Sequence, residues 1–229
     1  MSADRDFARE LYPFLYTPAA RVPAPLGAVL ESVRQSTLVK CDELIALRIE
    51  LAEMYEAQFA AAATAMIARF DGGGKLVAFG NGGSATDADD AAIDCTQPPH
   101  PGWRVFPAIS LPADGATVTA VANDVGIEHV FVRQLHALGE RGDIALGFST
   151  SGHSGNVLAA FGEARRRGML TIALTGYDGG AIARSGVVDF SFIARREFVP
   201  RIQEGHATIW HTLLVCIQSD LMHRAGIAA

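Results

Sequence analysis

Two short loops gather the kinds of residue that bind phosphate groups and sugar hydroxyls. The first, GNGGS (Gly80 to Ser84), follows the apolar run KLVAFG and precedes a predicted helix. Its glycines let the backbone approach an anion, and the helix N-terminus offers unpaired N–H groups. The second, STSGHSGN (Ser149 to Asn156), also lies between a strand and a helix and carries four hydroxyls, those of Ser149, Thr150, Ser151 and Ser154. Together the two loops predict a phosphorylated sugar as the ligand.

The first loop also fits a second pattern. GNGGSA matches the loose GxGxxA form of a dinucleotide-binding fingerprint, which requires an acidic residue about 20 residues on, near the end of the next strand. The acidic residue near the end of that strand, Asp114, comes about 30 residues on. A phosphosugar therefore fits the two loops better than a dinucleotide does.

The helix after the first loop carries a run of carboxylates. Asp87, Asp90 and Asp94 share one face of that helix at spacings of three and four, and Asp89 lies beside them. In the plainest interpretation, Asp87 favours the helix N-terminus and the other carboxylates are solvated. Asp94 fits this interpretation poorly, because the residues around it are apolar and indicate burial. A buried carboxylate needs a partner or a metal.

The last helical stretch of the chain holds two further polar candidates. Within RIQEGHATIWH, Gln203 and His211 lie two turns apart on one helix. His211 is flanked by Trp210 and Leu213, so a hydrogen-bonded core histidine is the alternative to a catalytic one.

Five short apolar runs position these groups. They are KLVAFG, VFPAISL, DIALGF, LTIALTG and VVDFSFI, each flanked by Gly, Ser or Asp and separated by helical lengths. Strands that alternate with helices predict an α/β fold, with a parallel, doubly wound sheet between two layers of helices, a three-layer αβα sandwich. Ligands of such sheets bind beyond the carboxyl ends of the strands, where both loops fall.

The flanking segments complete a single predicted domain over residues 1–229. Residues 1–25 hold four prolines and predict an irregular arm, whereas residues 26–70 have a helical pattern. Ala60 to Ile67 is apolar on nearly every face, which predicts burial against another helix or another subunit. The arginines of NVLAAFGEARRRG, closed by Gly168, suit the negative end of a helix dipole in a solvated role.

Composition limits the classes of function. Of 229 residues, 49% are hydrophobic and 19% are charged, which predicts a packed core. The formal charge of −6 argues against a general nucleic-acid binder, whose surface should be basic. We expect reduced and mostly buried thiols at Cys41, Cys95 and Cys216, which have no CxxC spacing. No signal sequence and no apolar stretch of about 20 residues is evident, so a cytoplasmic protein without a membrane segment is predicted.

Five motifs occur in the order and spacing of a known family. They are GNGGS, the pair Asn123–Asp124, STSGHS, LTGYDGG (Leu174 to Gly180) and RIQEGH (Arg201 to His206). Over about Lys75 to Leu221 the chain therefore resembles the phosphoheptose isomerases, a subgroup of proteins with the sugar isomerase (SIS) fold. The resemblance implies an SIS domain preceded by long N-terminal helices.

The same resemblance implies an activity and a site. The activity is that of a ketose–aldose isomerase acting on sedoheptulose 7-phosphate, in a homotetramer with active sites at subunit interfaces and commonly with zinc. Asp94 would remove the proton next to the carbonyl and His211 would act on the oxygen. The implied metal ligands are Asp90, Asp94, Gln203 and His211. The implied substrate-binding residues are Asn81, Gly82, Gly83, Ser84, Asn123, Asp124, Ser149, Thr150, Ser151, Ser154 and Gln203.

Four positions depart from the family's pattern. Asp90 stands in place of a metal-binding His, Asp94 in place of a catalytic Glu, Pro98 in place of an Arg, and Pro200 in place of an Asp. Two carboxylates, an amide and one imidazole form an oxygen-rich donor set, so manganese or magnesium can compete with zinc. Two alternatives to the isomerase stay open: a non-catalytic protein-binding factor, as some relatives are, and a sensor that binds a phosphosugar without turnover.

Overall fold

The computed structural model describes residues 25–226. The arm predicted over residues 1–25 therefore lies outside the described residues, apart from Pro25. In chain order, the elements are α2 (Leu26–Asp71), β1 (Leu76–Gly80), α3 (Gly83–Thr96), β2 (Ala108–Ser110), the 3₁₀ turn η2 (Leu111–Ala113), α4 (Gly115–Asp124), the 3₁₀ turn η3 (Ile127–His129), α5 (Val130–Leu138), β3 (Ile144–Ser149), α6 (Gly155–Arg166), β4 (Leu170–Gly176), α7 (Gly180–Arg184), β5 (Phe190–Ala194) and α8 (Val199–Arg224).

The five predicted strands form one parallel sheet in the order β2-β1-β3-β4-β5. Each of the five apolar runs supplies one strand. β2 is shorter than its run predicts, because Pro107 precedes it and has no N–H to give to a ladder. The carbonyl of Pro107 still accepts a hydrogen bond from the N–H of Leu76 at 2.9 Å, which joins β2 to β1.

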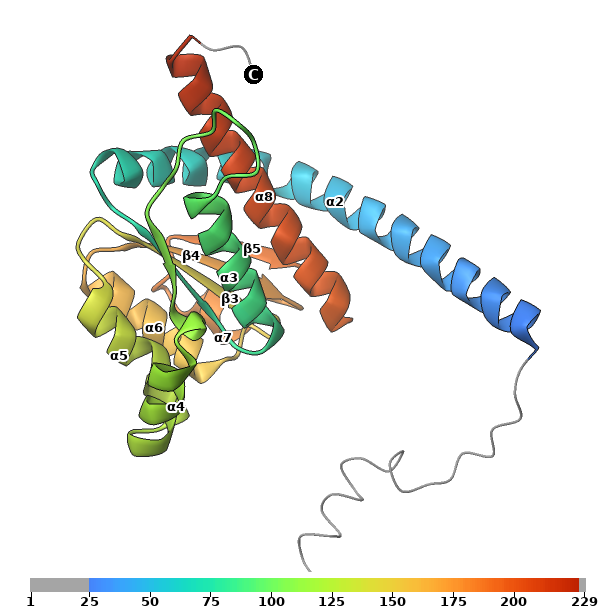
Figure 1. Ribbon diagram of the computed structural model, residues 1–229, viewed down its shortest axis with the longest axis horizontal. Coiled ribbons are helices and arrows are strands. Elements are labelled where there is room, and N and C mark those ends of the chain that lie inside the picture. Colours follow the sequence, from blue (N-terminus) through green and yellow to red (C-terminus); the bar gives the residue numbers. More distant parts are fainter. Residues whose placement is uncertain (1–24, 227–229) are drawn as a thin grey trace, which may run out of the picture. The chain divides into compact units, whose positions relative to one another are not determined.

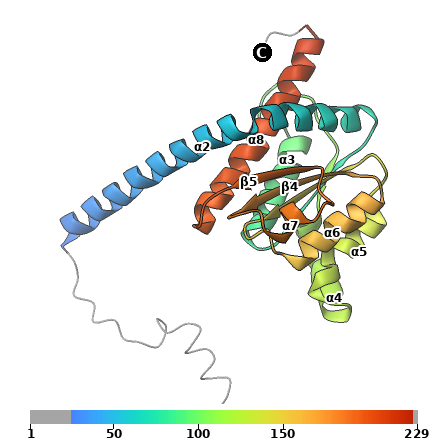
Figure 2. The ribbon, with the colours of Figure 1, turned by 180° about the vertical axis from the view of Figure 1, so that it is seen from behind.

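Helices cover both faces of the sheet, as Figures 1 and 2 show. Along β1, Leu76 and Ala78 point into a core formed with α2, α3 and α8, whereas Val77 and Phe79 point into a second core formed with α5, α6 and α7. This alternation follows from the two-residue repeat of a strand. The predicted three-layer αβα sandwich is confirmed.

The predicted helical region 26–70 is one continuous helix, α2. The chain divides into two compact units, Met1–Asp42 and Glu43–Ala229, so α2 contributes to both of them. Within the second unit, α2 buries a stripe that begins at Leu47. In the segment Ala60 to Ile67, Ala62, Ala63, Met66 and Ile67 are buried, so one face of the predicted apolar segment enters the core.

Two expectations about polar and sulfur-containing residues have mixed outcomes. The arginine run does have a structural role: Arg166 and Arg167 both pair with Glu163, at 2.7 Å each, and Arg165 pairs with Asp189. All three cysteines are free, but Cys41 is exposed, so the expectation of a mostly buried set is wrong for that residue.

Among the described helices, none is long and apolar enough to cross a bilayer.

Candidate functional site

The first predicted loop lies directly beyond the carboxyl end of β1 and leads into α3. Gly82 has φ +58°, a left-handed conformation that favours glycine. A Cβ atom on Gly80 would lie 2.4 Å from the carbonyl oxygen of Ser84, so the loop closes only because Gly80 has no side chain. The loop therefore folds tightly, with the side chain of Ser84 buried beneath it.

The second predicted loop lies beyond the carboxyl end of β3 and leads into α6. The hydroxyls of Ser149 and Ser154 lie 2.9 Å apart, and the N–H of Gly152 donates to Ser149 Oγ at 3.1 Å. Ser151 is exposed and Thr150 is half-buried. Within the described residues, the N-cap residues of α3 and α6 make no side-chain cap, and the N–H groups of Gly83, Gly155 and Asn156 have no hydrogen-bond partner there. This arrangement suits an oxyanion such as a phosphate.

A pair of asparagines joins the two loops. The Asn81 amide donates to Asn156 Oδ1 at 2.8 Å, and the Asn156 amide donates back to Asn81 Oδ1 at 2.9 Å. Asn156 also accepts the N–H of Val157 at 2.9 Å. Asn156 closes the STSGHSGN motif, but its type alone gave no reason to expect a role in joining the loops.

Asp94 and His211, the predicted catalytic pair, face each other across α3 and α8. Asp94 Oδ2 lies 3.5 Å from His211 Nε2 and accepts the indole N–H of Trp210 at 2.9 Å. Trp210 is thus the partner that a partly buried Asp94 was expected to need. The His211 side chain is 63% exposed, so the alternative of a core histidine is wrong for this residue. A carboxylate oriented by an N–H donor beside an open imidazole is an arrangement able to move protons.

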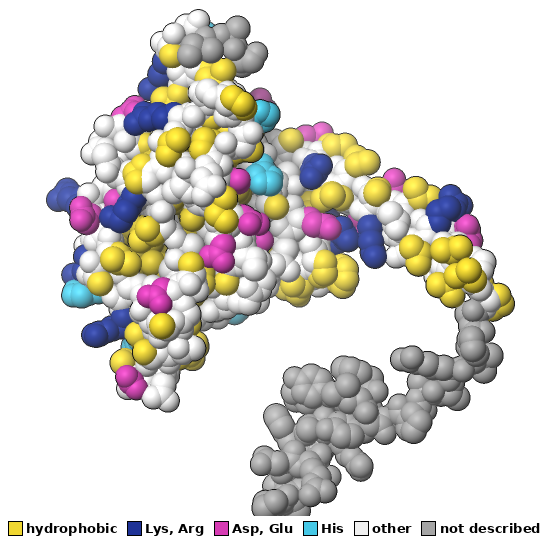
Figure 3. All heavy atoms as spheres, in the orientation of Figure 1, with side chains coloured by type: hydrophobic (Ala, Val, Ile, Leu, Met, Phe, Trp, Pro, Cys, Tyr) yellow, Lys and Arg dark blue, Asp and Glu magenta, His cyan; other side chains and the backbone are white. Residues whose placement is uncertain are grey.

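Gln203 and Asp90 lie on the same two helices. The Gln203 amide lies over the first loop, because a Cβ on Gly83 would come 2.3 Å from Gln203 Nε2. Partial burial, and then the carboxylates of Asp94, Asp87 and Asp89, raise the pKa of Asp90, while His211 lowers it. Figure 3 shows acidic side chains gathered over α3. The raised pKa of Asp90 thus reflects its partial removal from water first and the neighbouring carboxylates second.

The predicted metal ligands come together only in part. Among the described residues, no three His, Cys, Asp or Glu side chains form a group able to hold a metal ion. Asp94 and His211 are within reach of each other, but Asp90 does not complete a cluster with them. The donor types and the carboxylates gathered on α3 suit a divalent cation, and Asp94 and His211 are the two donors whose contact the structure records.

Two predicted substrate-binding residues lie on α4, and one departure from the family pattern lies on α8. Asn123 and Asp124 are exposed at the end of α4, where the Asn123 amide donates to Asp124 Oδ1 at 2.8 Å. In Figure 1, α4 extends beyond the carboxyl edge of the sheet. Pro200 occupies the first turn of α8, a position that accepts proline because the N–H there is unpaired in any helix.

Comparison with known proteins gives this fold and site a class. Residues 41–176 match the SIS domain family. The phosphoheptose isomerase of Geobacter sp. (strain M21) is 36% identical over 193 residues, which cover 84% of this chain and 97% of that protein. The phosphoheptose isomerase of Pelobacter propionicus is 43% identical over 166 residues, covering 72% of this chain and 84% of the relative.

Solved structures agree with the sequence relatives. Phosphoheptose isomerase GmhA from Neisseria gonorrhoeae superimposes with a TM-score of 0.74 at 35% identity, covering 82% of this chain and 99% of that one. A phosphoheptose isomerase from Francisella tularensis gives 0.75 at 33% identity, covering 83% and 98%. The chain belongs to the phosphoheptose isomerase family of SIS domain proteins, and the family and fold predicted from the motifs are confirmed.

Proposed function

We propose that the protein is an intramolecular aldose–ketose isomerase that converts sedoheptulose 7-phosphate to D-glycero-D-manno-heptose 7-phosphate in the cytoplasm. The observation that carries the proposal is the 3.5 Å approach of Asp94 Oδ2 to His211 Nε2, on the two helices that flank the first phosphate loop. An enediol isomerisation needs one group to carry a carbon-bound proton and a second to manage charge on the neighbouring oxygen. Asp94 and His211 supply one of each.

The reaction follows from these positions. Asp94 takes a proton from C1 of the ketose, and the C–H electron pair forms the C1–C2 double bond of an enediol as the carbonyl oxygen gains a proton. His211 supplies that proton to O2 and accepts the one that leaves O1. The proton held by Asp94 is then returned to C2, which gives the aldose. The indole N–H of Trp210 keeps the Asp94 carboxylate aimed at the substrate.

The two loops hold the phosphate end of the sugar. The hydroxyls of Ser151 and Ser154 and the N–H groups that open α6 supply donors, while the Asn81–Asn156 amide pair fixes the spacing between the loops. Holding a substrate in one orientation contributes much of an enzyme's rate acceleration, because the entropy of alignment is lost on binding rather than in the reaction.

A divalent metal, with zinc as the first choice, is part of the proposal. Asp90, Asp94, Gln203 and His211 would hold it, and it would polarise the substrate carbonyl. Two features support a cation here: the donor types, and the carboxylates of Asp94, Asp87 and Asp89, which add to the effect of burial in raising the pKa of Asp90. Metal content per chain, measured by mass spectrometry after dialysis against zinc, is expected to fall in an Asp90→Asn variant.

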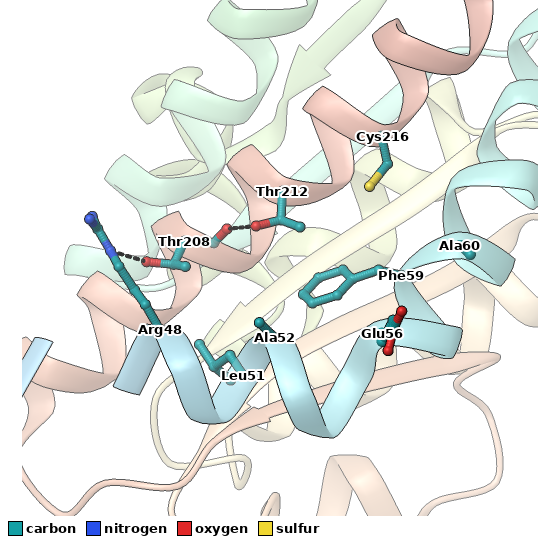
Figure 4. Close-up of a pocket in the computed structure, with 9 residues that line it drawn as sticks. All are labelled: Arg48, Leu51, Ala52, Glu56, Phe59, Ala60, Thr208, Thr212 and Cys216. Carbon is teal, nitrogen blue, oxygen red and sulfur yellow. Dashed lines mark hydrogen bonds between the residues drawn. The ribbon is translucent and has the colours of Figure 1, made fainter. Parts of the chain in front are cut away.

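The active form is proposed to be a homotetramer. A cleft of about 280 Å³ lies between α2 and α8, with largely apolar walls that include Leu51, Phe59 and Cys216 (Figure 4). It adjoins a second cleft lined by His211 and Val215, so the predicted catalytic histidine opens onto the same surface.

A second copy of the chain is the proposed occupant of these clefts. Ile45 and Ile49, one turn apart on α2, and Val215 on α8 are each about half exposed, and exposed apolar side chains favour association. At the rim, the Arg48 guanidinium donates to the Thr208 hydroxyl at 3.3 Å, its one hydrogen bond among the described residues. Light scattering at micromolar concentration is expected to give four times the chain mass, and a monomer would contradict the proposal.

An assay over a panel of sugar phosphates, with metal-stripped and zinc-reconstituted protein, tests the function. We expect turnover of sedoheptulose 7-phosphate above that of pentose and hexose phosphates. Binding of the phosphosugar without turnover under any metal condition would instead support a sensor. Absence of both binding and turnover would support a protein-binding factor and would overturn the isomerase.

A further inference from the structure

A buried polar pair that the proposed reaction does not use lies behind the site. His206 on α8 has no exposed surface, and neither of its ring nitrogens has a hydrogen-bond partner among the described residues. Asp87 Oδ2 on α3 is also buried without a partner there. Buried polar atoms are almost always hydrogen-bonded, so three such atoms together call for an explanation.

The two side chains face each other at a distance that no bond satisfies. Asp87 Oδ2 lies 3.8 Å from His206 Nδ1. This exceeds the range of about 2.7–3.2 Å for an N–H···O bond, and it is too short for a water between them, since two bonds in series span about 5 Å. A closing movement of about 1 Å or less would make the bond directly.

The pair lies one helical turn away from residues that are proposed to bind the substrate. Asp87 is one helical turn after Ser84, which ends the first loop, and His206 is one turn after Gln203, whose amide lies over Gly83. The His206 ring packs against Phe148, with ring centroids 6.0 Å apart, and Phe148 precedes the first serine of the second loop. Asp87 and His206 therefore lie on the two helices that carry Asp94, Gln203 and His211, so their separation is tied to the spacing of those side chains.

We propose that Asp87 and His206 are a positioning pair: His206 Nδ1–H donates to Asp87 Oδ2 as α3 and α8 close on a bound sugar phosphate. This rests on the proposed isomerase function. Neither residue is assigned a contact with substrate: His206 is wholly buried, and the Asp87 side chain, 15% exposed, faces His206. The bond acts through Gln203, Asp94 and His211, whose helices it draws into the catalytic arrangement.

Three variants separate positioning from packing. His206→Phe keeps a ring of similar size and removes the donor, whereas His206→Asn places an amide N–H where Nδ1–H lies. Asp87→Asn keeps an acceptor oxygen. With sedoheptulose 7-phosphate, we expect His206→Phe to lower kcat by roughly 10- to 100-fold with less than about a threefold change in KM, because a 1 Å misplacement is costly in the chemical step. The His206→Asn and Asp87→Asn variants are each expected to keep most of the wild-type kcat.

Histidine ¹⁵N NMR supplies a readout that does not need turnover. In wild-type protein, saturation with sedoheptulose 7-phosphate, or with inorganic phosphate, should convert the His206 signal to an Nδ1-protonated, hydrogen-bonded form, and Asp87→Leu should abolish it. An unchanged His206 spectrum, wild-type kcat in His206→Phe, or equal losses of kcat in the His206→Phe and His206→Asn variants would overturn the proposed positioning role.

Failure of the proposed reaction can be told apart from failure of the positioning role. If wild-type protein turns over no phosphosugar, the proposed reaction fails, and the NMR titration with phosphate still tests the Asp87–His206 bond. Thermal melts of each variant identify any that fail to fold, and Asp87→Leu then replaces His206→Phe.

Discussion

At the amino edge of the sheet, polar side chains are richly hydrogen-bonded, whereas beyond the carboxyl edge several are left without partners. Asp143, just before β3, accepts the N–H and the ammonium of Lys75 at 2.9 and 2.7 Å and the N–H of Glu140 at 2.8 Å. Asp189, just before β5, accepts both the N–H and the hydroxyl of Thr171.

Beyond the carboxyl edge, the balance is reversed. Asp87 and His206 have buried atoms with no partner in the described part of the chain, and Asp90 has a raised pKa because of burial and like charge. The bonds of Asp143 and Asp189 fix the starts of neighbouring strands, which is a structural role. Groups with unused bonding capacity and uncompensated charge can bind a ligand, and the cost of keeping them is offset elsewhere in the structure.

The largest expected effect is on turnover, at the carboxyl edge. Asp94→Asn keeps the shape of the side chain and its bond to Trp210 but removes the base, so kcat should fall by roughly 10²–10⁴ while sugar-phosphate affinity is largely kept. Asp89→Asn is the matched control, because Asp89 lies on the same helix and bonds to Ser110. Equal kcat values for the two variants would show that Asp94 is not the base.

A large effect on stability is expected at the amino edge. Asp143→Ala leaves the backbone N–H groups of Lys75 and Glu140 without their acceptor, so the free energy of unfolding should drop by about 3 kcal/mol. Ser154→Ala, at the carboxyl edge, removes one hydroxyl contact and should cost less than about 1 kcal/mol. Urea unfolding of both variants measures the difference, and a larger loss for Ser154→Ala would reverse the comparison.

Alanine substitutions at two glycines with positive φ should lower the stability of the fold by intermediate amounts. Gly152, in the second loop, has φ +65°, and a Cβ there would lie 2.2 Å from the carbonyl oxygen of Gly179. Gly142, at the amino edge, has φ +100°, with open space around its Cβ position. We expect Gly152→Ala to lower stability by about 2–3 kcal/mol and Gly142→Ala by about 1 kcal/mol. Thermal or urea unfolding that ranks Gly142→Ala as the more damaging change would contradict the loop geometry.

The smallest effect concerns the charge of Asp90. Its pKa is raised in the folded protein, so the folded state holds the proton more tightly than the unfolded state. This contribution favours the folded protein below the unfolded pKa and is lost as the pH rises through the folded value. Asp90→Asn should therefore raise stability slightly at neutral pH, by a fraction of a kcal/mol after solvent screening, and should flatten the pH dependence above about pH 4. A metal-free variant that is less stable than wild type at pH 7 would contradict this sign.

Much of the fold follows from local patterns. The strands β1, β3 and β4 are buried on both faces, so their sequences are continuous apolar runs that need no long-range information to recognise. The two loops were also predictable, since their glycines and serines are local and the carboxyl edge is where parallel sheets bind ligands.

The groups that depend on packing between helices were harder to predict. Nothing in the types of Asn156 and Asp87 indicates that one joins the two loops and the other faces a buried histidine. The apolar neighbours of His211 in sequence kept a core histidine open as an alternative, yet His211 is exposed, whereas His206, for which no burial was predicted, is the buried histidine. The rotation of helix α8 about its own axis determines which of the two histidines faces the core, and a single sequence does not specify that rotation.

Isomerisation of sedoheptulose 7-phosphate in D₂O, followed by proton NMR, tests the central claim most directly. A base that takes a proton from C1 and returns one to C2 exchanges it with solvent on the way, so wild-type protein should form the aldose with deuterium at C2. Asp94→Asn should form it at least about 100-fold more slowly. Wild-type protein that forms no aldose and incorporates no deuterium, with zinc present or absent, would contradict the assignment of this site as an isomerase centre.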